Sequence, residues 1–125
     1  RIDRPDASRS TTTYDAIGRT SQIRHSTSAN AEIDRAFYTY DAVGNPLTYD
    51  RRDTRFTYSY DALDQLHTEH DKYSGLVTWN YDAARHRKSD SRSAGLSTYT
   101  YDAADQLTSV ETSAGLTNYT HDAQG

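Results

Sequence analysis

The chain contains no cysteine, no methionine and no run of 18 apolar residues. Without cysteine it can form no disulfide framework, no thiolate metal site and no catalytic thiol. Without a long apolar run it is not expected to cross a membrane as a helix. The sequence has no recognisable signal peptide, lacks an initiator methionine and stops within a motif. We therefore expect a fragment of a longer protein, whose targeting signal would lie outside this chain.

Aliphatic residues are scarce as well, because the hydrophobic fraction is only 34% and includes all 11 tyrosines. A core of aliphatic side chains cannot be built from this composition, and by composition alone a disordered chain is an alternative. The many tyrosine and threonine residues favour β-strands instead. The formal net charge of -4 is small, so it gives no reason to expect a nucleic acid or an anionic membrane as a partner.

What the sequence does contain is an internal repeat centred on a Tyr-Asp pair. Five pairs recur at intervals of 20 to 26 residues, and a degenerate His121-Asp122 pair follows them. Alanine follows every pair, a second aromatic residue precedes five of the six pairs by two positions, and three copies begin with Gly-Leu. The pairs are Tyr14-Asp15, Tyr40-Asp41, Tyr60-Asp61, Tyr81-Asp82 and Tyr101-Asp102; the second aromatic residues are Tyr38, Tyr58, Trp79, Tyr99 and Tyr119; the Gly-Leu glycines are Gly75, Gly95 and Gly115.

A period of about 20 residues suits a β-hairpin. In one copy, residues 96–101 are predicted to form a strand whose two tyrosines share a face, and residues 106–112 a second, more polar strand. Between these strands, Asp102 is expected to begin a type I turn. Its carboxylate should accept a hydrogen bond from the backbone N–H two residues further on.

The fifth residue of each turn, counted from the tyrosine, is expected to adopt a positive φ, which glycine does most readily. Most copies meet this need, but Arg85 fits it poorly, so its turn is predicted to differ from the others. The remaining residues at this position are the glycines Gly18, Gly44 and Gly125 and the aspartates Asp64 and Asp105, which tolerate a positive φ.

We therefore predict an all-β fold of tandem hairpins that form a curved antiparallel sheet. Glycine turns such as residues 113–115 join the hairpins, and the six extra residues of the first interval are placed in a longer loop from about His25 to Asp34. A single sheet has a face that needs a second layer, and its open edges are an aggregation hazard. The sheet is thus expected to coil, to close with further repeats or to pack on another body.

The segments YTYDAVGNPLT, YSYDALDQLHT and YTYDAADQLTS resemble the YD repeats of the RHS-repeat proteins. That family includes bacterial Rhs toxins, the C subunit of insecticidal toxin complexes, wall-associated proteins and teneurins. The resemblance covers residues 12–125, interpreted as about five YD repeats, with residues 1–11 as the end of a preceding repeat. It implies repeats that spiral into a larger, hollow β-shell, which in the toxins encloses a C-terminal toxic domain. The glycine of the family motif is replaced at Asp64, Arg85 and Asp105, and its leucine at Thr20 and Arg87.

Several candidate binding sites have a structural interpretation beside the functional one. The tyrosine ladder could bind sugars by stacking, but its period favours packing of one sheet face. The turn aspartates could bind Ca²⁺, but each turn offers only one or two ligands, which favours turn capping. His67 and His70 are expected on opposite strand faces, so no shared metal is predicted. The basic stretch of residues 85–88 is interpreted as a solvated strand face.

We interpret the chain as a structural segment of a shell that encapsulates a toxin or effector cargo in a secreted polymorphic toxin. No catalytic constellation is recognisable, so no enzymatic activity, cofactor or metal is expected. The expected partners are flanking repeats of the same chain, an enclosed cargo domain and, in one alternative, glycans. The alternatives are an extracellular carbohydrate-binding or adhesion module and the scaffold of an autoprocessing protein. The expected location is secreted or cell-surface, in a bacterium.

Overall fold

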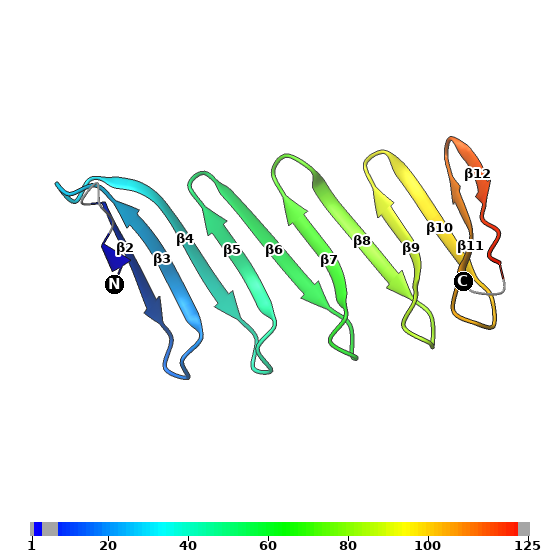
Figure 1. The fold of residues 1–125 in the computed structure, drawn as a ribbon, viewed down its shortest axis with the longest axis horizontal. Helices are drawn as coiled ribbons and strands as arrows, with labels where there is room; N and C mark the ends of the chain where they lie inside the picture. The colour runs from blue at the N-terminus through cyan, green and yellow to red at the C-terminus, as the bar shows by residue number, and fades with distance from the viewer. Residues whose placement is uncertain (1, 4–7, 123–125) are drawn as a thin grey trace. The chain divides into compact units, whose positions relative to one another are not determined.

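The computed structural model describes residues 2–3 and 8–122. Within these residues the regular secondary structure consists of β-strands alone. The predicted all-β fold is confirmed (Figure 1). No helix in the described part of the chain could cross a membrane. The strands are β1 (Ile2–Asp3), β2 (Arg9–Tyr14), β3 (Thr20–Ser26), β4 (Glu32–Tyr40), β5 (Pro46–Arg51), β6 (Thr54–Tyr60), β7 (Leu66–Asp71), β8 (Gly75–Tyr81), β9 (Arg87–Arg92), β10 (Gly95–Tyr101), β11 (Leu107–Thr112) and β12 (Gly115–Asn118).

The chain divides into two compact units, residues 1–59 and residues 60–125. In the first unit each strand pairs antiparallel with the next in sequence, from β1 to β6. The second unit repeats this pattern from β7 to β12. Each unit is thus an antiparallel meander. Among the described residues, only Val77 is a buried hydrophobic residue, so neither unit encloses an aliphatic core.

A β-bulge marks the strand end that carries the Tyr-Asp tyrosine. The strand register shifts between Thr100 and Tyr101, which leaves Thr108 of β11 without a directly opposite partner. Equivalent shifts occur immediately before Tyr14, Tyr40 and Tyr81. In each case the extra residue lies on the strand that follows the turn, so that strand bends, and the alternation of β10 continues through Tyr99, Thr100 and Tyr101.

The six extra residues of the first interval are divided equally between a longer turn and longer strands. The connection between β3 and β4 is residues 27–31, which is shorter than predicted, because His25 and Asp34 lie within strands. Asn30 has a φ of 64° and donates its backbone N–H to the carbonyl of Thr27 at 3.0 Å. Thr27 Oγ1 accepts a further hydrogen bond from the N–H of Ala31 at 3.1 Å. The extra residues therefore form a capped turn and extend β4 to 9 residues.

Aromatic rings form the packed part of the first unit. Tyr38 on β4 lies opposite Tyr49 on β5, and Tyr49 lies opposite Phe56 on β6. The ring centres are 5.1 Å and 5.7 Å apart, with interplanar angles of 19° and 21°. Cross-strand aromatic pairs of this kind stabilise a fold by about 0.5–1.5 kcal/mol beyond their buried area. Stacked aromatic rings thus replace the missing aliphatic core.

A buried carboxylate forms the corresponding part of the second unit. Asp90 on β9 is only 2% exposed and lies opposite Trp79 on β8 and Ser97 on β10. Its carboxylate accepts hydrogen bonds from the Tyr99 hydroxyl at 2.6 Å and from Arg92 Nε at 3.0 Å. Burial opposes ionisation of Asp90, but these two hydrogen bonds outweigh it and keep the pKa below its usual value.

Candidate functional site

The Tyr-Asp turns are the most regular feature of the molecule, and the aspartate closes each of them. In the turn after β10, Asp102 Oδ1 accepts hydrogen bonds from the N–H of Ala104 at 2.8 Å and of Gln106 at 3.0 Å. The N–H of Asp105 donates to the carbonyl of Asp102 at 3.1 Å, as in a type I turn. The predicted hydrogen bond from the N–H of Ala104 to the Asp102 carboxylate is therefore present. The N–H of Gln106 donates a second hydrogen bond that the sequence did not predict.

All five complete Tyr-Asp turns in the described residues share this double hydrogen bond. One carboxylate oxygen of each aspartate is thus occupied by two backbone donors, which is the arrangement of a turn cap. No cluster of three metal-ligating side chains occurs in the described part of the chain. The other four caps are Asp15 with Ile17 and Arg19, Asp41 with Val43 and Asn45, Asp61 with Leu63 and Gln65, and Asp82 with Ala84 and His86.

Arg85 follows the same turn geometry as the other copies, so the prediction that its turn differs is wrong. It has a φ of 72°, and its N–H donates to the carbonyl of Asp82 at 3.0 Å. Asp64 and Asp105 at the equivalent position have φ values of 60° and 64°. The hydrogen bonds of the turn therefore impose the left-handed conformation even on a residue that disfavours it. Gly125, predicted at this position, lies outside the described residues.

Hydrogen bonds within the turn lower the pKa of Asp15 and of Asp102. Backbone N–H groups of Gln106 and Ala104 lower the pKa of Asp102 below its ordinary value of 3.8. A side-chain hydrogen bond from Arg19 is the main cause of the lowered pKa of Asp15. These carboxylates are charged at neutral pH, as capping by backbone donors requires.

In three of the Tyr-Asp pairs the tyrosine hydroxyl donates a hydrogen bond to the preceding repeat, a role that the sequence did not predict. The Tyr101 hydroxyl donates to the carbonyl of Arg87 at 3.0 Å, and Arg87 lies five residues after Asp82. His121 occupies the tyrosine position of the degenerate copy, and its Nε2 contacts the equivalent carbonyl, that of Leu107, at 2.8 Å. The same inter-repeat hydrogen bond joins Tyr40 to Thr20 at 2.8 Å and Tyr81 to Leu66 at 2.9 Å.

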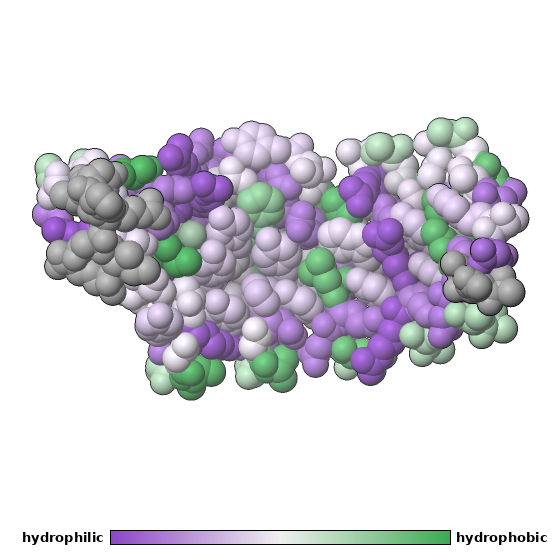
Figure 2. Space-filling model, viewed as in Figure 1, coloured by the Kyte–Doolittle hydropathy of each residue, from purple (hydrophilic) through white to green (hydrophobic). Residues whose placement is uncertain are grey.

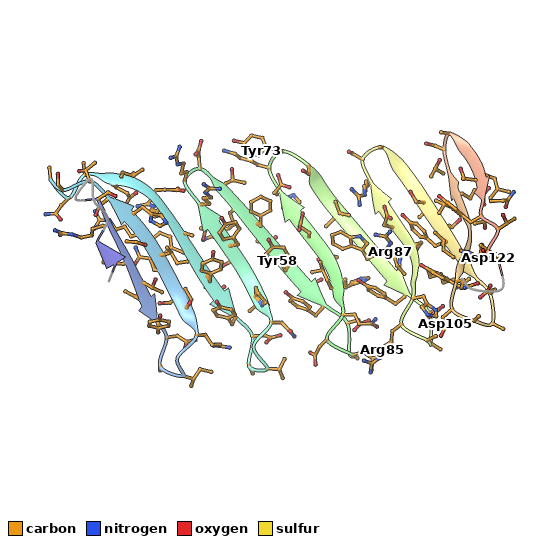
Figure 3. All side chains as sticks on the ribbon, in the orientation of Figure 1. Tyr58, Tyr73, Arg85, Arg87, Asp105 and Asp122 are labelled. Atoms are coloured by element: carbon orange, nitrogen blue, oxygen red, sulfur yellow. The ribbon has the colours of Figure 1, made fainter. Side chains whose placement is uncertain are left out.

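The second aromatic residues do not share one environment. Tyr38 is stacked, Tyr99 donates to Asp90, and the Trp79 carbonyl accepts from His67 Nδ1 at 2.9 Å. Tyr119 is 44% exposed, and its N–H donates to the carbonyl of Thr108. Tyr58 lies on β6 (Figure 3). The sheet uses this position for different contacts in different repeats.

The Gly-Leu glycines begin β8, β10 and β12, each directly after the turn at the other end of a hairpin. Gly75, Gly95 and Gly115 have φ values of 73°, 131° and 132°. A Cβ on Gly95 would meet Ser113 Oγ at 3.5 Å, an ordinary contact distance. The backbone angle, and not crowding, therefore favours glycine at these positions, most strongly at Gly95 and Gly115. Tyr73 marks this end of a hairpin in Figure 3, and Arg85 and Asp105 mark the Tyr-Asp end.

The sequence predicted that the basic stretch at residues 85–88 is a solvated strand face. The structure shows that the stretch is neither wholly in a strand nor uniformly solvated. Arg85 lies in a turn, and His86 is half-buried with its ring stacked on Tyr101 at a centre distance of 4.6 Å. The guanidinium of Arg87 lies 4.4 Å from the centre of the Tyr99 ring. Positive charge in this stretch is thus used within the sheet, by ring contacts.

Apolar side chains gather at the tips of the Tyr-Asp turns (Figure 2). Ile17 and Val43, each two residues after the turn aspartate, are 71% exposed in the first unit. Leu63 is equivalent to them in the second unit and is 54% exposed. These residues form the most exposed apolar feature of the turns.

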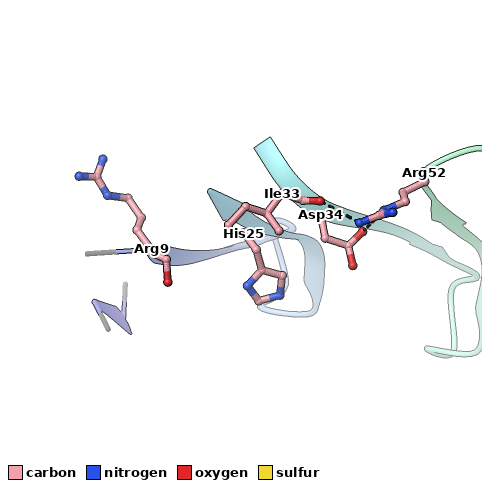
Figure 4. Close-up of a pocket in the computed structure, with 6 residues that line it drawn as sticks. Arg9, His25, Ile33, Asp34 and Arg52 are labelled. Atoms are coloured by element: carbon pink, nitrogen blue, oxygen red, sulfur yellow. Dashed lines mark hydrogen bonds and ion pairs between the residues drawn. The ribbon is translucent and has the colours of Figure 1, made fainter. Parts of the chain in front are cut away.

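A hollow of about 250 Å³ in the first unit is lined by residues including Arg9, His25 and Arg52 (Figure 4). The Arg52 guanidinium is already bound to Asp34 at 3.2 Å and to the carbonyl of Ile33 at 3.0 Å. Arg9 extends away from the His25 ring in Figure 4, and its Nη1 donates to Asn30 elsewhere. The Arg9 Nε is buried without a hydrogen-bond partner in the described residues. These side chains do not converge on one point where a ligand could bind.

Comparisons with known proteins bear on the fold. No protein-family model matches the chain, and no curated protein matches its sequence. Solved structures do match it. The crystal structure of TcdB2-TccC3-TEV is 21% identical, with a TM-score of 0.72 over 83% of this chain and 6% of that chain. The crystal structure of TcdB2-TccC3 is 16% identical, with a TM-score of 0.75 over 90% of this chain and 7% of that chain.

The fold of this chain is similar to that of short segments of toxin-complex chains. The structure of the Photorhabdus luminescens Tc holotoxin pore also matches, at 14% identity and a TM-score of 0.56 over 94% of this chain and 8% of that chain. The chain spans less than a tenth of the length of each of these chains. At these identities the similarity concerns the fold alone.

Proposed function

We propose that the chain is a structural, non-enzymatic segment of an RHS/YD-repeat shell that encloses a C-terminal toxin or effector domain. The inter-repeat hydrogen bond from the Tyr-Asp position is the observation that carries this proposal. It occurs at four junctions between repeats in the described residues and uses the same pair of positions each time, so further hairpins could be joined in the same way. The likeness to toxin-complex chains supports the same architecture.

Each unit is a single layer, which supports the proposal that a partner outside the described residues packs against it. Within the described residues of each unit no second layer covers either face of the sheet, and β12 is exposed along its whole length. Flanking repeats of the same protein would pair with β12, and an enclosed cargo would lie on one side of the sheet. A secreted or cell-surface location in a bacterium follows from the role of a toxin shell.

The test is to image the full-length protein that contains this segment, together with a limited-proteolysis assay of any domain that follows the repeats. We expect a hollow shell, and a C-terminal domain that becomes protease-sensitive only after the shell is denatured. A solid or extended particle, or a C-terminal domain cleaved at the same rate in both states, would overturn the proposal.

Two alternatives make different predictions. A carbohydrate-binding module should bind saturably on a glycan array, whereas a shell segment should not. The stacked rings of Tyr38, Tyr49 and Phe56 cover one another's faces, which favours the shell segment. A scaffold in an autoprocessing protein should lose cleavage when a turn residue such as Asp102 is replaced, with the fold retained.

A further inference from the structure

Arg19, which lies four residues after the turn aspartate Asp15, binds two successive turns of the first unit. Its Nε donates to Asp15 Oδ2 at 2.7 Å, and its Nη1 donates to the carbonyl of Asp41 in the next turn at 2.7 Å. The guanidinium carbon lies 4.6 Å from the centre of the Tyr40 ring. One side chain therefore contacts its own turn, the next turn and the next tyrosine.

His86 occupies the same position in the second unit and makes the same set of contacts by different chemistry. Its Nδ1 lies 3.3 Å from Asp82 Oδ2 in its own turn, and its Nε2 lies 3.5 Å from Asp105 Oδ1 in the next turn. The ring stacks on Tyr101 with an interplanar angle of 28°. The His86 side chain is 23% exposed, but Asp105 is 72% exposed, so the contact with the next turn lies at the surface.

We propose that the residue four positions after each turn aspartate is a bridge residue, which couples one Tyr-Asp turn to the next with a strength that depends on its side chain. Asn45, Gln65 and Gln106 occupy this position in the other repeats, and Asn45 Nδ2 donates to Asp41 Oδ2 of its own turn at 3.1 Å. Within the described residues, no side-chain hydrogen bond or ion pair joins either glutamine to the next turn. The backbone repeat is thus regular, but its junctions are coupled unevenly.

The chemistry of the bridge explains which side chains can form it. The group must extend past its own aspartate and lie flat on the next tyrosine ring. A guanidinium or an imidazole is planar and cationic when protonated, so it can stack on the ring and pair with a carboxylate or carbonyl oxygen. A glutamine amide carries no charge and gains less from either contact. Arg19 and His86 satisfy these requirements, and the glutamines do not.

Amide hydrogen exchange, measured by NMR on the full chain, tests the bridge at each junction. We expect His86→Ala to speed exchange of the Gln106 amide in the next turn about two- to five-fold, the range for a partly exposed side-chain contact. The Gln65 amide, in another turn of the same unit, should not change. His86→Arg should keep the slow exchange. Equal acceleration at Gln106 and Gln65 would mean a general loss of stability and would overturn the proposal.

A gain-of-function variant keeps the test valid if His86→Ala fails to fold. Gln65→Arg should create a bridge to the Asp82 turn and slow exchange of its Arg85 amide about two- to five-fold. Gln65→Met, which has a similar length and no charge, is the matched control and should leave that amide unchanged. If the arginine and methionine variants behave alike, charge and planarity do not determine the coupling, and the proposal is wrong.

Discussion

The tyrosine hydroxyl distinguishes the Tyr-Asp position from the aromatic position two residues earlier. A ring at either position can pack on the sheet, but the hydroxyl of Tyr101 reaches a carbonyl of the preceding repeat. Arg87 begins β9, the neighbour of β10 that belongs to the preceding repeat. The histidine of the degenerate copy contacts the equivalent carbonyl through Nε2. The polar atom at this position is therefore part of the repeat, together with the ring.

Removing that hydroxyl should weaken the second unit measurably. Tyr101→Phe keeps the ring and deletes the hydrogen bond to Arg87, so the free energy of unfolding should fall by about 0.5–1.5 kcal/mol. Urea unfolding followed by tyrosine fluorescence measures this change. Tyr14→Phe is the matched control, because Tyr14 is 63% exposed and its hydroxyl has no partner in the described residues. Similar losses in both variants would contradict the inter-repeat role.

The acid stability of the first unit should depend on Asp34. Hydrogen bonds from the Arg51 guanidinium are the main cause of a lowered pKa, from 3.8 to about 2. A folded-state pKa below the unfolded value stabilises the fold above pH 3.8, and that stabilisation disappears as the pH falls towards 2. The melting temperature should therefore drop between pH 4 and pH 2. Asp34→Asn should melt lower at pH 5 and show a shallower drop; an unchanged slope would contradict this assignment.

Much of the residue-level pattern was predictable, and the missing part has a physical cause. The turn aspartates and the glycines of the Gly-Leu pairs are local features, because a turn is closed by atoms within four or five residues. The contact between Tyr101 and Arg87 joins different repeats, and it depends on how β9 and β10 align across the sheet. Alternation along a single strand does not reveal that alignment.

At the scale of the element, hydrogen bonds within each hairpin outweigh local preference. The turn at Arg85 forms despite its unfavourable residue, because Asp82 provides the same acceptors as in the other copies. The extra residues near Asn30 form a capped turn and a longer strand for the same reason. Residue preferences along a segment therefore predicted the strands well. The preference of Arg85 alone predicted its turn badly.

Two substitutions at positive φ should act in opposite directions. Arg85→Gly removes the left-handed strain of a side chain that is exposed, and should stabilise the second unit by about 0.5–1 kcal/mol after the added chain entropy of glycine. Gly95→Val places a β-branched residue at a φ of 131°, and should destabilise by about 1–3 kcal/mol or prevent folding. Urea midpoints compare the two variants with the parent chain. A destabilised Arg85→Gly variant would mean that the arginine makes a contact worth more than its strain.

At the scale of the whole molecule, stability depends on what pairs with the sheet edges and covers its faces. The only buried hydrophobic residue among those described is Val77, and buried polar residues such as Asp71 and Asp90 outnumber it. Each unit is therefore held by backbone ladders, caps and aromatic stacks. The backbone N–H and C=O groups of a strand are paired on both sides only where it has two neighbouring strands. We therefore expect the edge strand β12 to be the least stable strand of its unit.

The outer edge of β12 should make the chain self-associate, and its register identifies the groups responsible. The N–H of Tyr119 donates to Thr108 of β11. Because bonded pairs alternate along an antiparallel ladder, Thr117 also faces β11, and Leu116 and Asn118 direct their N–H groups outward. Leu116→Pro deletes an outward donor and leaves the inner ladder intact, so it should abolish association without unfolding the hairpin.

Thr117→Pro is the matched control, because it removes an inward donor and should break the β11–β12 hairpin instead. Sedimentation velocity over a range of concentrations should show a rising average mass for the parent chain and a constant monomer mass for Leu116→Pro. A parent chain that stays monomeric at every concentration would mean that this edge is already protected within the chain. The case for flanking repeats at β12 would then be lost, since a protected edge needs no neighbour.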